Sequence, residues 1–437
     1  MTLIARESSV APLKVTSQPL ITDVRLVDLI PDVADATVWS TVDASTGLDE
    51  GLVGWGRAAV IKPPAGPARF ADGMRALGDV AATATIDDTV DARGSGLVAF
   101  GSFTFDDDAA GSVMIVPQVI VGRRDGTTWL TEVTPVDGSG VRPLQPVTDT
   151  KQRTARPVDT DRPRYAGATR SDVQWLEAVA AAIDRIRQGD VDKVVLARDL
   201  AVWSRTPFDP NVLARRLQRH FPSCHTFVVD GLVGATPELL VGKFSNRVTS
   251  RVLAGTIGRD HDPRSDDELA ARLMASDKDR REHALAVDSV RDVLSARCRD
   301  LAHDDDPTVL KLENVQHLAT WFEGTLDAVT DVLSLAAALH PTAAVGGTPR
   351  QAALALLRDL EGIDRGRYAA PVGWTDASGD GEWGIALRCA ELAGTRARLF
   401  AGVGIVEGSL PEAELAETRL KLLAMQAVLG ESADLGR

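Results

Sequence analysis

Residues 370–406 have the sequence APVGWTDASGDGEWGIALRCAELAGTRARLFAGVGIV, and this stretch decides the fold class. It consists of apolar segments of strand length, and the turn sequence ASGDG at residues 377–381 separates the first segment from the next. Glycine and aspartate at a turn between β-branched and aromatic residues are typical of antiparallel hairpins. A helix is predicted from about Pro411, where the sequence PEAELAETRLKLL begins. The stretch therefore predicts an antiparallel hairpin series that a helix follows.

Strands and helices also mix in the part of the chain before this stretch. Ser171 is expected to cap a helix whose apolar residues follow helical spacing and which ends near Gly189. The next predicted elements are a strand over residues 193–203, a helix over 211–221, a strand over 225–231 and a long helix from about Ser265 to Cys298. Strand, helix and strand do not alternate regularly, so we expect an α+β fold in which helices pack on large antiparallel sheets.

The first 160 residues predict mostly short antiparallel strands, such as SVMIVPQVIVG at residues 112–122, which glycine and aspartate separate. Glycine, proline, threonine and charged residues then replace periodic apolar residues over residues 136–165. This composition makes residues 136–165 a candidate seam between two parts of the chain.

Composition excludes several classes of protein. The chain has 437 residues, of which 44% are hydrophobic, and this is enough apolar material for a large core. The formal net charge is −14 without a basic stripe, which argues against nucleic acid as a partner. Cys224, Cys298 and Cys389 lie far apart without a CxxC pair, so neither a disulfide framework nor a zinc site is indicated. The sequence has neither a secretory signal nor a run of about 18 apolar residues, so we expect a cytoplasmic protein that does not contact a membrane.

Two of the predicted helices carry a row of charged or metal-binding side chains at helical spacing, and each row includes two carboxylates. The rows comprise Asp279, Glu282 and His283 on the first helix and Glu414, Glu417 and Lys421 on the second. Such rows could together bind Mg²⁺, which takes one or two protein carboxylates and bridges to an anionic substrate. Each row alone is more typical of a solvated helix face or of an i,i+4 salt bridge. The spacing leaves both interpretations open.

Two further charged residues stand among apolar neighbours. Lys193 opens the apolar strand at residues 193–203, and Glu238 lies between Pro237 and Leu239 in GLVGATPELLVG. Burial lowers the pKa of a lysine, which can then act as a base, and raises the pKa of a glutamate, which can then donate a proton. The simpler alternatives are a solvated lysine at a strand edge and an exposed glutamate in a turn.

Glycine-rich turns are the remaining candidates. They are LAGTIGR around Gly255 and Thr256, AVGGTP at residues 344–349, and AGVGIV around Gly404. Glycine permits close approach of the backbone to a ligand, although each turn alone is more often only a turn. His317 lies among apolar residues, where a structural histidine is the usual finding. Phosphate-loop, G-x-S-x-G and H-E-x-x-H motifs are absent from the sequence, so nucleotide chemistry, a serine hydrolase and a zinc protease are not indicated.

These segments together resemble the chorismate-utilising enzymes, which include isochorismate synthase, salicylate synthase and the large components of anthranilate and aminodeoxychorismate synthase. Ten motifs occur in the family's order: KVVLAR, GATPELL, LAGT, SDKDRREH, VQHLAT, LHPTAAVGGTP, YAAPVGW, GEWGIALRCAEL, AGVGIVEGS and PEAELAETRLK. The resemblance implies one large α+β (α/β) domain. Residues 1–160 would be its β-rich N-terminal part and residues 165–430 its chorismate-binding catalytic region. We also expect a monomer or a weak homodimer.

The resemblance also implies a role for individual residues. Lys193 would be the general base that activates water for attack at C2 of chorismate, and Glu238 the general acid that protonates the departing C4 hydroxyl. Glu282 and Glu417, with Glu414 and Asp279 beside them, would bind Mg²⁺, which would hold the ring carboxylate. The substrate site would comprise Gly255, Thr256, His317, Ala344, Tyr368, Leu387, Arg388, Gly404 and Lys421, with Arg388 and Tyr368 on the enolpyruvyl carboxylate.

Three positions sort the reactions within this family. Enzymes that use ammonia typically have glutamine where Lys193 stands, and aminodeoxychorismate synthases have a nucleophilic lysine at the position of Ala254. Members that eliminate pyruvate tend to have Thr-x-Ser-Gly where residues 344–347 are Ala-Val-Gly-Gly. The resemblance therefore implies an isomerase, an isochorismate synthase of the menaquinone or siderophore type. Salicylate synthase and a non-catalytic chorismate-binding relative are the alternatives. The chain also departs from the family at Ala370, where glycine is common.

Overall fold

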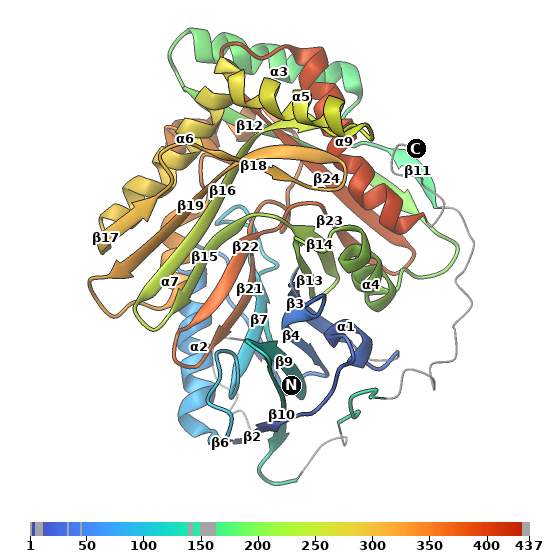
Figure 1. Cartoon of the computed structure of the whole chain (residues 1–437), viewed down its shortest axis with the longest axis vertical. Coiled ribbons are helices and arrows are strands. Elements are labelled where there is room, and N and C mark those ends of the chain that lie inside the picture. The colour runs from blue at the N-terminus through green and yellow to red at the C-terminus, as the bar shows by residue number, and fades with distance from the viewer. Residues whose placement is uncertain are drawn as a thin grey trace.

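The hairpin series predicted at residues 370–406 is present in the computed structural model of the protein (Figure 1). β21 (Pro371–Asp376) pairs antiparallel with β22 (Gly381–Ile385), and β23 (Cys389–Ala393) pairs antiparallel with β24 (Arg396–Ile405). The series does not stay in one sheet, however, because β22 and β23 belong to different sheets. The chain therefore crosses from one sheet to the other between Ile385 and Cys389. The structure describes residues 2–4, 12–32, 35–43, 46–138, 143–148 and 163–430.

The first sheet has eleven strands. Its order is β1 (Thr2–Ile4), β5 (Ala59–Lys62), β8 (Val113–Val116), β7 (Val98–Ser102), β21, β22, β15 (Leu239–Phe244), β16 (Arg247–Gly258), β19 (Val315–Leu326) and β17 (Cys298–His303), and β18 (Thr308–Lys311) also pairs with β19. All these pairs are antiparallel except β1 with β5.

The second sheet has thirteen strands. Its order is β11 (Arg164–Gly167), β12 (Lys193–Trp203), β24, β23, β14 (Leu232–Thr236), β13 (His225–Val229), β3 (Ala36–Val42), β4 (Asp49–Trp55), β9 (Val119–Arg124), β10 (Thr127–Pro135), β2 (Leu13–Pro19) and β6 (Thr85–Asp88), and β20 (Gly347–Thr348) also pairs with β12. The chain also crosses between the sheets at Pro237 and Glu238, between β14 and β15.

Both sheets combine strands from before and after the candidate seam. β7 pairs with β21 in the first sheet, and β3 pairs with β13 in the second. Strands from either side of the candidate seam therefore form one α+β fold, as expected. Of the seam itself, residues 139–142 and 149–162 lie outside the described residues.

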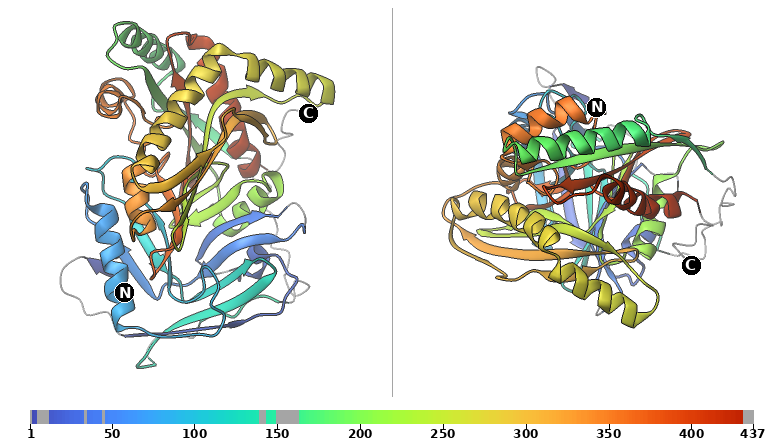
Figure 2. Two further views of the ribbon diagram at one scale, coloured as in Figure 1. Left: turned by 60° about the vertical axis from the view of Figure 1, so that its left-hand side comes forward. Right: turned by 90° about the horizontal axis from the view of Figure 1, so that it is seen from above.

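The helices lie around these sheets (Figure 2). They are α1 (Leu26–Leu29), α2 (Arg69–Thr83), α3 (Asp172–Arg187), α4 (Pro210–His220), α5 (Pro263–Ala275), α6 (Asp277–Ser295), α7 (Val332–Leu339), α8 (Arg350–Leu360) and α9 (Pro411–Leu429). α3 begins as predicted, because the Ser171 hydroxyl accepts a hydrogen bond from the Gln174 backbone N–H in a capping box. The strand-rich interpretation of residues 1–160 missed α2. Among the described residues, no helix combines the length and the apolar character needed to cross a membrane.

The single long helix predicted from Ser265 to Cys298 is wrong. Ser276 has an extended backbone, with φ −75° and ψ 111°, and it ends α5 and begins α6. Its hydroxyl accepts the Asp279 amide at 3.2 Å, because serine caps a helix start better than it continues a helix. The break sets the start of α6, which carries Asp279 and Glu282.

Candidate active site

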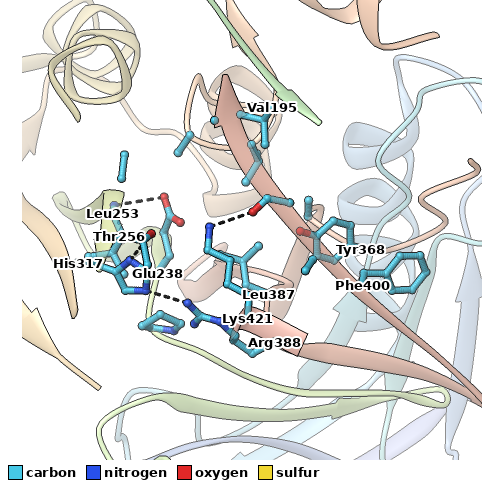
Figure 3. Close-up of a pocket in the computed structure, with 18 of the residues that line it drawn as sticks. Val195, Glu238, Leu253, Thr256, His317, Tyr368, Leu387, Arg388, Phe400 and Lys421 are labelled. Carbon is cyan, nitrogen blue, oxygen red and sulfur yellow. Dashed lines mark hydrogen bonds between the residues drawn. The ribbon is translucent and has the colours of Figure 1, made fainter. Parts of the chain in front are cut away.

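One cavity lies where elements of both sheets meet (Figure 3). Its volume is about 70 Å³. The predicted site residues that line it are Glu238, Gly255, Thr256, Glu282, His317, Ala344, Tyr368, Leu387, Arg388, Gly404 and Lys421. Glu238 stands at the crossing between β14 and β15, and Leu387 and Arg388 stand at the crossing between β22 and β23. The crossings thus bring an acid and a cation, distant in sequence, to one cavity.

Lys193 lies beside this cavity without lining it. It is the first residue of β12 and is 0% exposed, so the solvated strand-edge alternative is wrong. Its Nζ is 3.4 Å from Oε1 of Glu282, and Glu282 does line the cavity. Burial lowers the pKa of Lys193, although the neighbouring Glu282 carboxylate opposes this effect. A lysine in this position reaches its neutral, basic form more readily than one in water.

Glu238 is buried in the cavity wall with 3% exposure, so the exposed-turn alternative is also wrong. Its Oε1 accepts the Leu253 backbone N–H at 3.5 Å. Burial raises the pKa of Glu238 to about 7, because the apolar surroundings disfavour the carboxylate. This glutamate therefore keeps a proton at a pH where most glutamates have lost theirs.

The two rows of carboxylates meet around Lys278. Lys278 Nζ lies 3.1 Å from Glu414 Oε1, 3.6 Å from Asp279 Oδ1 and 3.7 Å from Glu282 Oε2. Glu414 is 3% exposed and Glu282 is 8% exposed, so these two residues are not on solvated helix faces. The sequence analysis missed Lys278, although its spacing of four residues from Glu282 on α6 was a signal.

Glu417 forms the i,i+4 salt bridge that its spacing allowed, at 2.7 Å from Lys421. Lys421 also donates to the Gly402 carbonyl at 2.9 Å, on the wall of the cavity. Lys421 thus connects the Glu417 carboxylate to the wall of the cavity. Its local salt bridge does not exclude metal binding, because a carboxylate can exchange one cation for another.

The donor set is compatible with Mg²⁺. Within the described residues, no three His, Cys, Asp or Glu side chains are already arranged to hold a metal ion. Mg²⁺ needs as few as one or two protein carboxylates and completes its shell with water and substrate oxygens. The position of Lys278 among three carboxylates shows that this part of the site already stabilises a positive charge. Hard oxygen donors around a cation are what Mg²⁺ requires.

Arg388 supplies a buried positive charge to the cavity wall, beside His317 (Figure 3). Its Nη2 lies 2.7 Å from His317 Nε2, and His317 Nδ1 lies 3.1 Å from the Thr256 hydroxyl. Burial, together with the charge of Arg388, holds the pKa of His317 well below its ordinary value, so His317 is a neutral acceptor for the guanidinium. Among the described residues, no carboxylate forms a salt bridge with Arg388. The cavity therefore presents an unneutralised cation to an anionic ligand.

Two backbone positions depend on small residues. A Cβ at Gly404 would lie 2.1 Å from Glu282 Oε1 and 2.8 Å from Lys193 Cε, so only glycine leaves room for that pair. Ala370, where the family commonly has glycine, is fully buried, and the positive φ of 61° belongs to its neighbour Ala369. The added methyl group at Ala370 is thus accommodated without the left-handed backbone conformation.

Sequence reasoning did not identify some residues in the cavity wall. Val195, Leu253 and Phe400 line it as apolar strand residues, which carry no chemical signal of a site. Phe400 stacks on Tyr368, with ring centroids 5.0 Å apart and an interplanar angle of 7°. Arg365 also lines the cavity, and the only signal for it is its spacing of four residues from Glu361.

Comparison with known proteins defines the class to which this fold and site belong. Residues 34–430 match the family model described as "Chorismate binding enzyme", so the chain belongs to the chorismate-binding enzyme family. It is 40% identical over 268 residues to the isochorismate synthase DhbC of Bacillus subtilis, a match that covers 59% of this chain and 67% of that protein. It is also 40% identical over 272 residues to the isochorismate synthase EntC of Escherichia coli, covering 61% and 69%.

A solved structure confirms the α+β architecture. The crystal structure of a putative 2,3-dihydroxybenzoate-specific isochorismate synthase, DhbC from Bacillus anthracis, matches with a TM-score of 0.74 and 28% identity. The match covers 93% of this chain and 98% of that structure, so the fold extends through both the β-rich N-terminal part and the part that holds the cavity.

Proposed function

We propose that this protein is an isochorismate synthase, an isomerase that converts chorismate to isochorismate by net transfer of a hydroxyl group from C4 to C2. The observation that carries the proposal is a buried glutamate in the cavity wall together with a buried lysine beside the cavity, each with its pKa displaced in the direction its role requires. The names of the relatives with about 40% identity support the same activity.

In this proposal Lys193 and Glu238 act on opposite ends of the transposition. Neutral Lys193 takes a proton from a water molecule as the water oxygen attacks C2 of chorismate. Protonated Glu238 gives its proton to the C4 hydroxyl, which leaves as water while the ring double bonds shift. The product has the composition of the substrate, and the same two groups in the opposite protonation states catalyse the reverse reaction.

The substrate carries two carboxylates, and each has a proposed partner. Arg388 would take the enolpyruvyl carboxylate, because a guanidinium can pair with both oxygens and this one lacks a carboxylate partner within the described residues. Tyr368 would support the same group. Glu282 and Glu417, with Glu414 and Asp279 nearby, would hold Mg²⁺. When bound, Mg²⁺ would neutralise the acids and provide a positive charge for the ring carboxylate.

Ala344 supports isochorismate as the final product. It lines the cavity at the position where family members that eliminate pyruvate tend to have a threonine. Its methyl group offers neither a donor nor an acceptor to the enolpyruvyl side chain. We therefore propose that the reaction stops before pyruvate is lost.

The experiment is product identification after incubation of the purified protein with chorismate and Mg²⁺. Isochorismate should form without pyruvate, which a lactate dehydrogenase assay detects. Pyruvate equal to the chorismate consumed would instead identify a salicylate synthase. Absence of turnover with Mg²⁺ present would favour a non-catalytic chorismate-binding relative.

A further inference from the structure

The strand that begins with Lys193 has a gap along one edge. One edge of β12 pairs with β24 from Val194 to Trp203. The other edge pairs with β20 at Lys193 and Val194 and with β11 from Ala201 onward. Among the described strands, none covers the residues between these two partners. Buried backbone groups need hydrogen-bond partners, so something else must satisfy this edge.

Two side chains supply hydrogen-bond partners along this edge, where the Gly346 carbonyl also accepts the Val195 N–H. Glu361 Oε2 accepts the Ala197 backbone N–H at 2.8 Å, and Arg365 Nη2 donates to the Val195 carbonyl at 2.6 Å. Arg365 also donates to both carboxylate oxygens of Glu361, each at 2.6 Å. Arg365 is 2% exposed and Glu361 is 6% exposed. The ion pair thus replaces a short length of strand on the edge of β12.

Arg365 also holds two other parts of the cavity wall. Its Nη1 donates to the Val345 carbonyl at 2.8 Å, next to Ala344. Its own backbone carbonyl accepts the Tyr368 N–H at 2.9 Å. All three guanidinium nitrogens therefore donate within the protein, which leaves Arg365 poorly suited to bind a substrate carboxylate although it lines the cavity.

We propose that Arg365 and Glu361 are positioning residues that fix β12 with Lys193, the loop with Ala344, and Tyr368 relative to one another. This inference rests on the proposed function for its kinetic consequence. A planar guanidinium sets both the distance and the angle between the groups it joins, whereas an ammonium sets neither. Displacement of a reacting group by about 1 Å can cost about 100-fold in rate.

A second buried ion pair provides a matched control. Arg123 Nη1 lies 3.1 Å from Asp49 Oδ1, with side-chain exposures of 4% and 0%. Arg123 also donates to backbone carbonyls, at Thr22 and Val24, as Arg365 does at Val195 and Val345. Neither member of this pair lines the cavity. Substitutions there disturb a comparable buried network away from the proposed chemistry.

The experiment compares Arg365→Lys and Glu361→Gln with Arg123→Lys in the full chain. Steady-state kinetics with chorismate and Mg²⁺ give kcat and KM, and urea unfolding gives the stability of each variant. We expect Arg365→Lys to lower kcat by about 30-fold to 100-fold while KM changes less than about fivefold. Arg123→Lys should lose a similar amount of stability and keep kcat within about twofold of the unmodified protein.

Amide hydrogen exchange gives a readout that does not depend on the substrate. Residues 193–197 and 344–348 should exchange at least about tenfold faster in Arg365→Lys than in Arg123→Lys. If the unmodified protein does not turn over chorismate, the proposed function fails, and the exchange still tests positioning. Equal exchange in the two variants, or a kcat loss that Arg123→Lys shares, would overturn the positioning role. So would unfolding of both Arg365→Lys and Glu361→Gln where Arg123→Lys stays folded, since the pair would then serve stability alone.

Discussion

Replacing Glu238 with glutamine tests the central electrostatic claim about the site. Burial raises the pKa of Glu238 from 4.5 to about 7. The folded protein therefore binds this proton more tightly than the unfolded chain does. Between about pH 4.5 and pH 7 the folded state carries more of the proton, so stability falls as pH rises through this range. Glutamine has nearly the same shape and cannot ionise, so the stability of the variant should not fall in this way as pH rises.

The magnitude follows from the pKa values. Each tenfold change in a proton-binding constant is worth about 1.4 kcal/mol, so a rise from 4.5 to about 7 corresponds to about 3 kcal/mol. Glu238→Gln should thus differ little from the unmodified protein near pH 4.5 and be more stable by about 3 kcal/mol above about pH 8. The glutamine oxygen can still accept the Leu253 N–H, so this hydrogen bond adds no large offset.

Urea unfolding at a series of pH values from 5 to 9 measures this difference. Glu412→Gln, at an exposed residue that does not line the cavity, is the control for removing one carboxyl group. A flat difference for Glu238→Gln would refute the claim that burial raises the pKa of Glu238. Turnover by Glu238→Gln should fall at least about 100-fold, because the general acid is lost. Full activity would refute the acid role even if the stability prediction held.

Three other results are expected. The pH dependence of kcat/KM should be bell-shaped, because turnover needs Glu238 with its proton and Lys193 without its extra proton; a rate that rises steadily to pH 9 would contradict the acid assignment. Ala344→Thr should release pyruvate from chorismate, measured with lactate dehydrogenase, whereas the unmodified protein should not. Equal amounts of pyruvate from the two proteins would show that residue 344 does not determine whether pyruvate is eliminated. Removal of Mg²⁺ with EDTA should abolish turnover, and added Mg²⁺ should restore it. Glu417→Gln should raise the Mg²⁺ concentration for half-maximal activity at least about tenfold. An unchanged Mg²⁺ requirement in Glu417→Gln would exclude Glu417 as a ligand.

The fold class was predictable from local patterns, because alternating apolar residues and glycine turns determine strands and hairpins over short distances. The division of strands between two sheets was not. The segment GEWGIALRCAEL has no turn signal inside it, but it supplies β22 to one sheet and β23 to the other. The break at Ser276 was also missed, because one capping hydroxyl overrode a helical pattern that continues on both sides.

The site shows the same limit at the level of single residues. The apolar neighbours of Lys193 and Glu238 left both a buried and a solvated position open, and the structure shows that both side chains are buried. Spacing could not show that Lys193 contacts Glu282, because that contact depends on where β12 and α6 pack. Nor could it show that Lys278 occupies the centre of the acids. The family resemblance supplied the choice between the solvated and buried alternatives, and local sequence could not.

The pairing of β7 with β21 has a consequence for synthesis of the protein. β7 ends at Ser102, and its partner β21 begins at Pro371, so 268 residues must be translated before the two can meet. At about 5 to 20 residues per second, the wait is about 13 to 54 seconds on the ribosome. Throughout that time one edge of β7, whose residues are all buried in the finished protein, lacks its final partner. An unpaired apolar strand edge is where nascent chains aggregate, so chaperone supply during translation should govern the yield of this protein more than the stability of its completed fold.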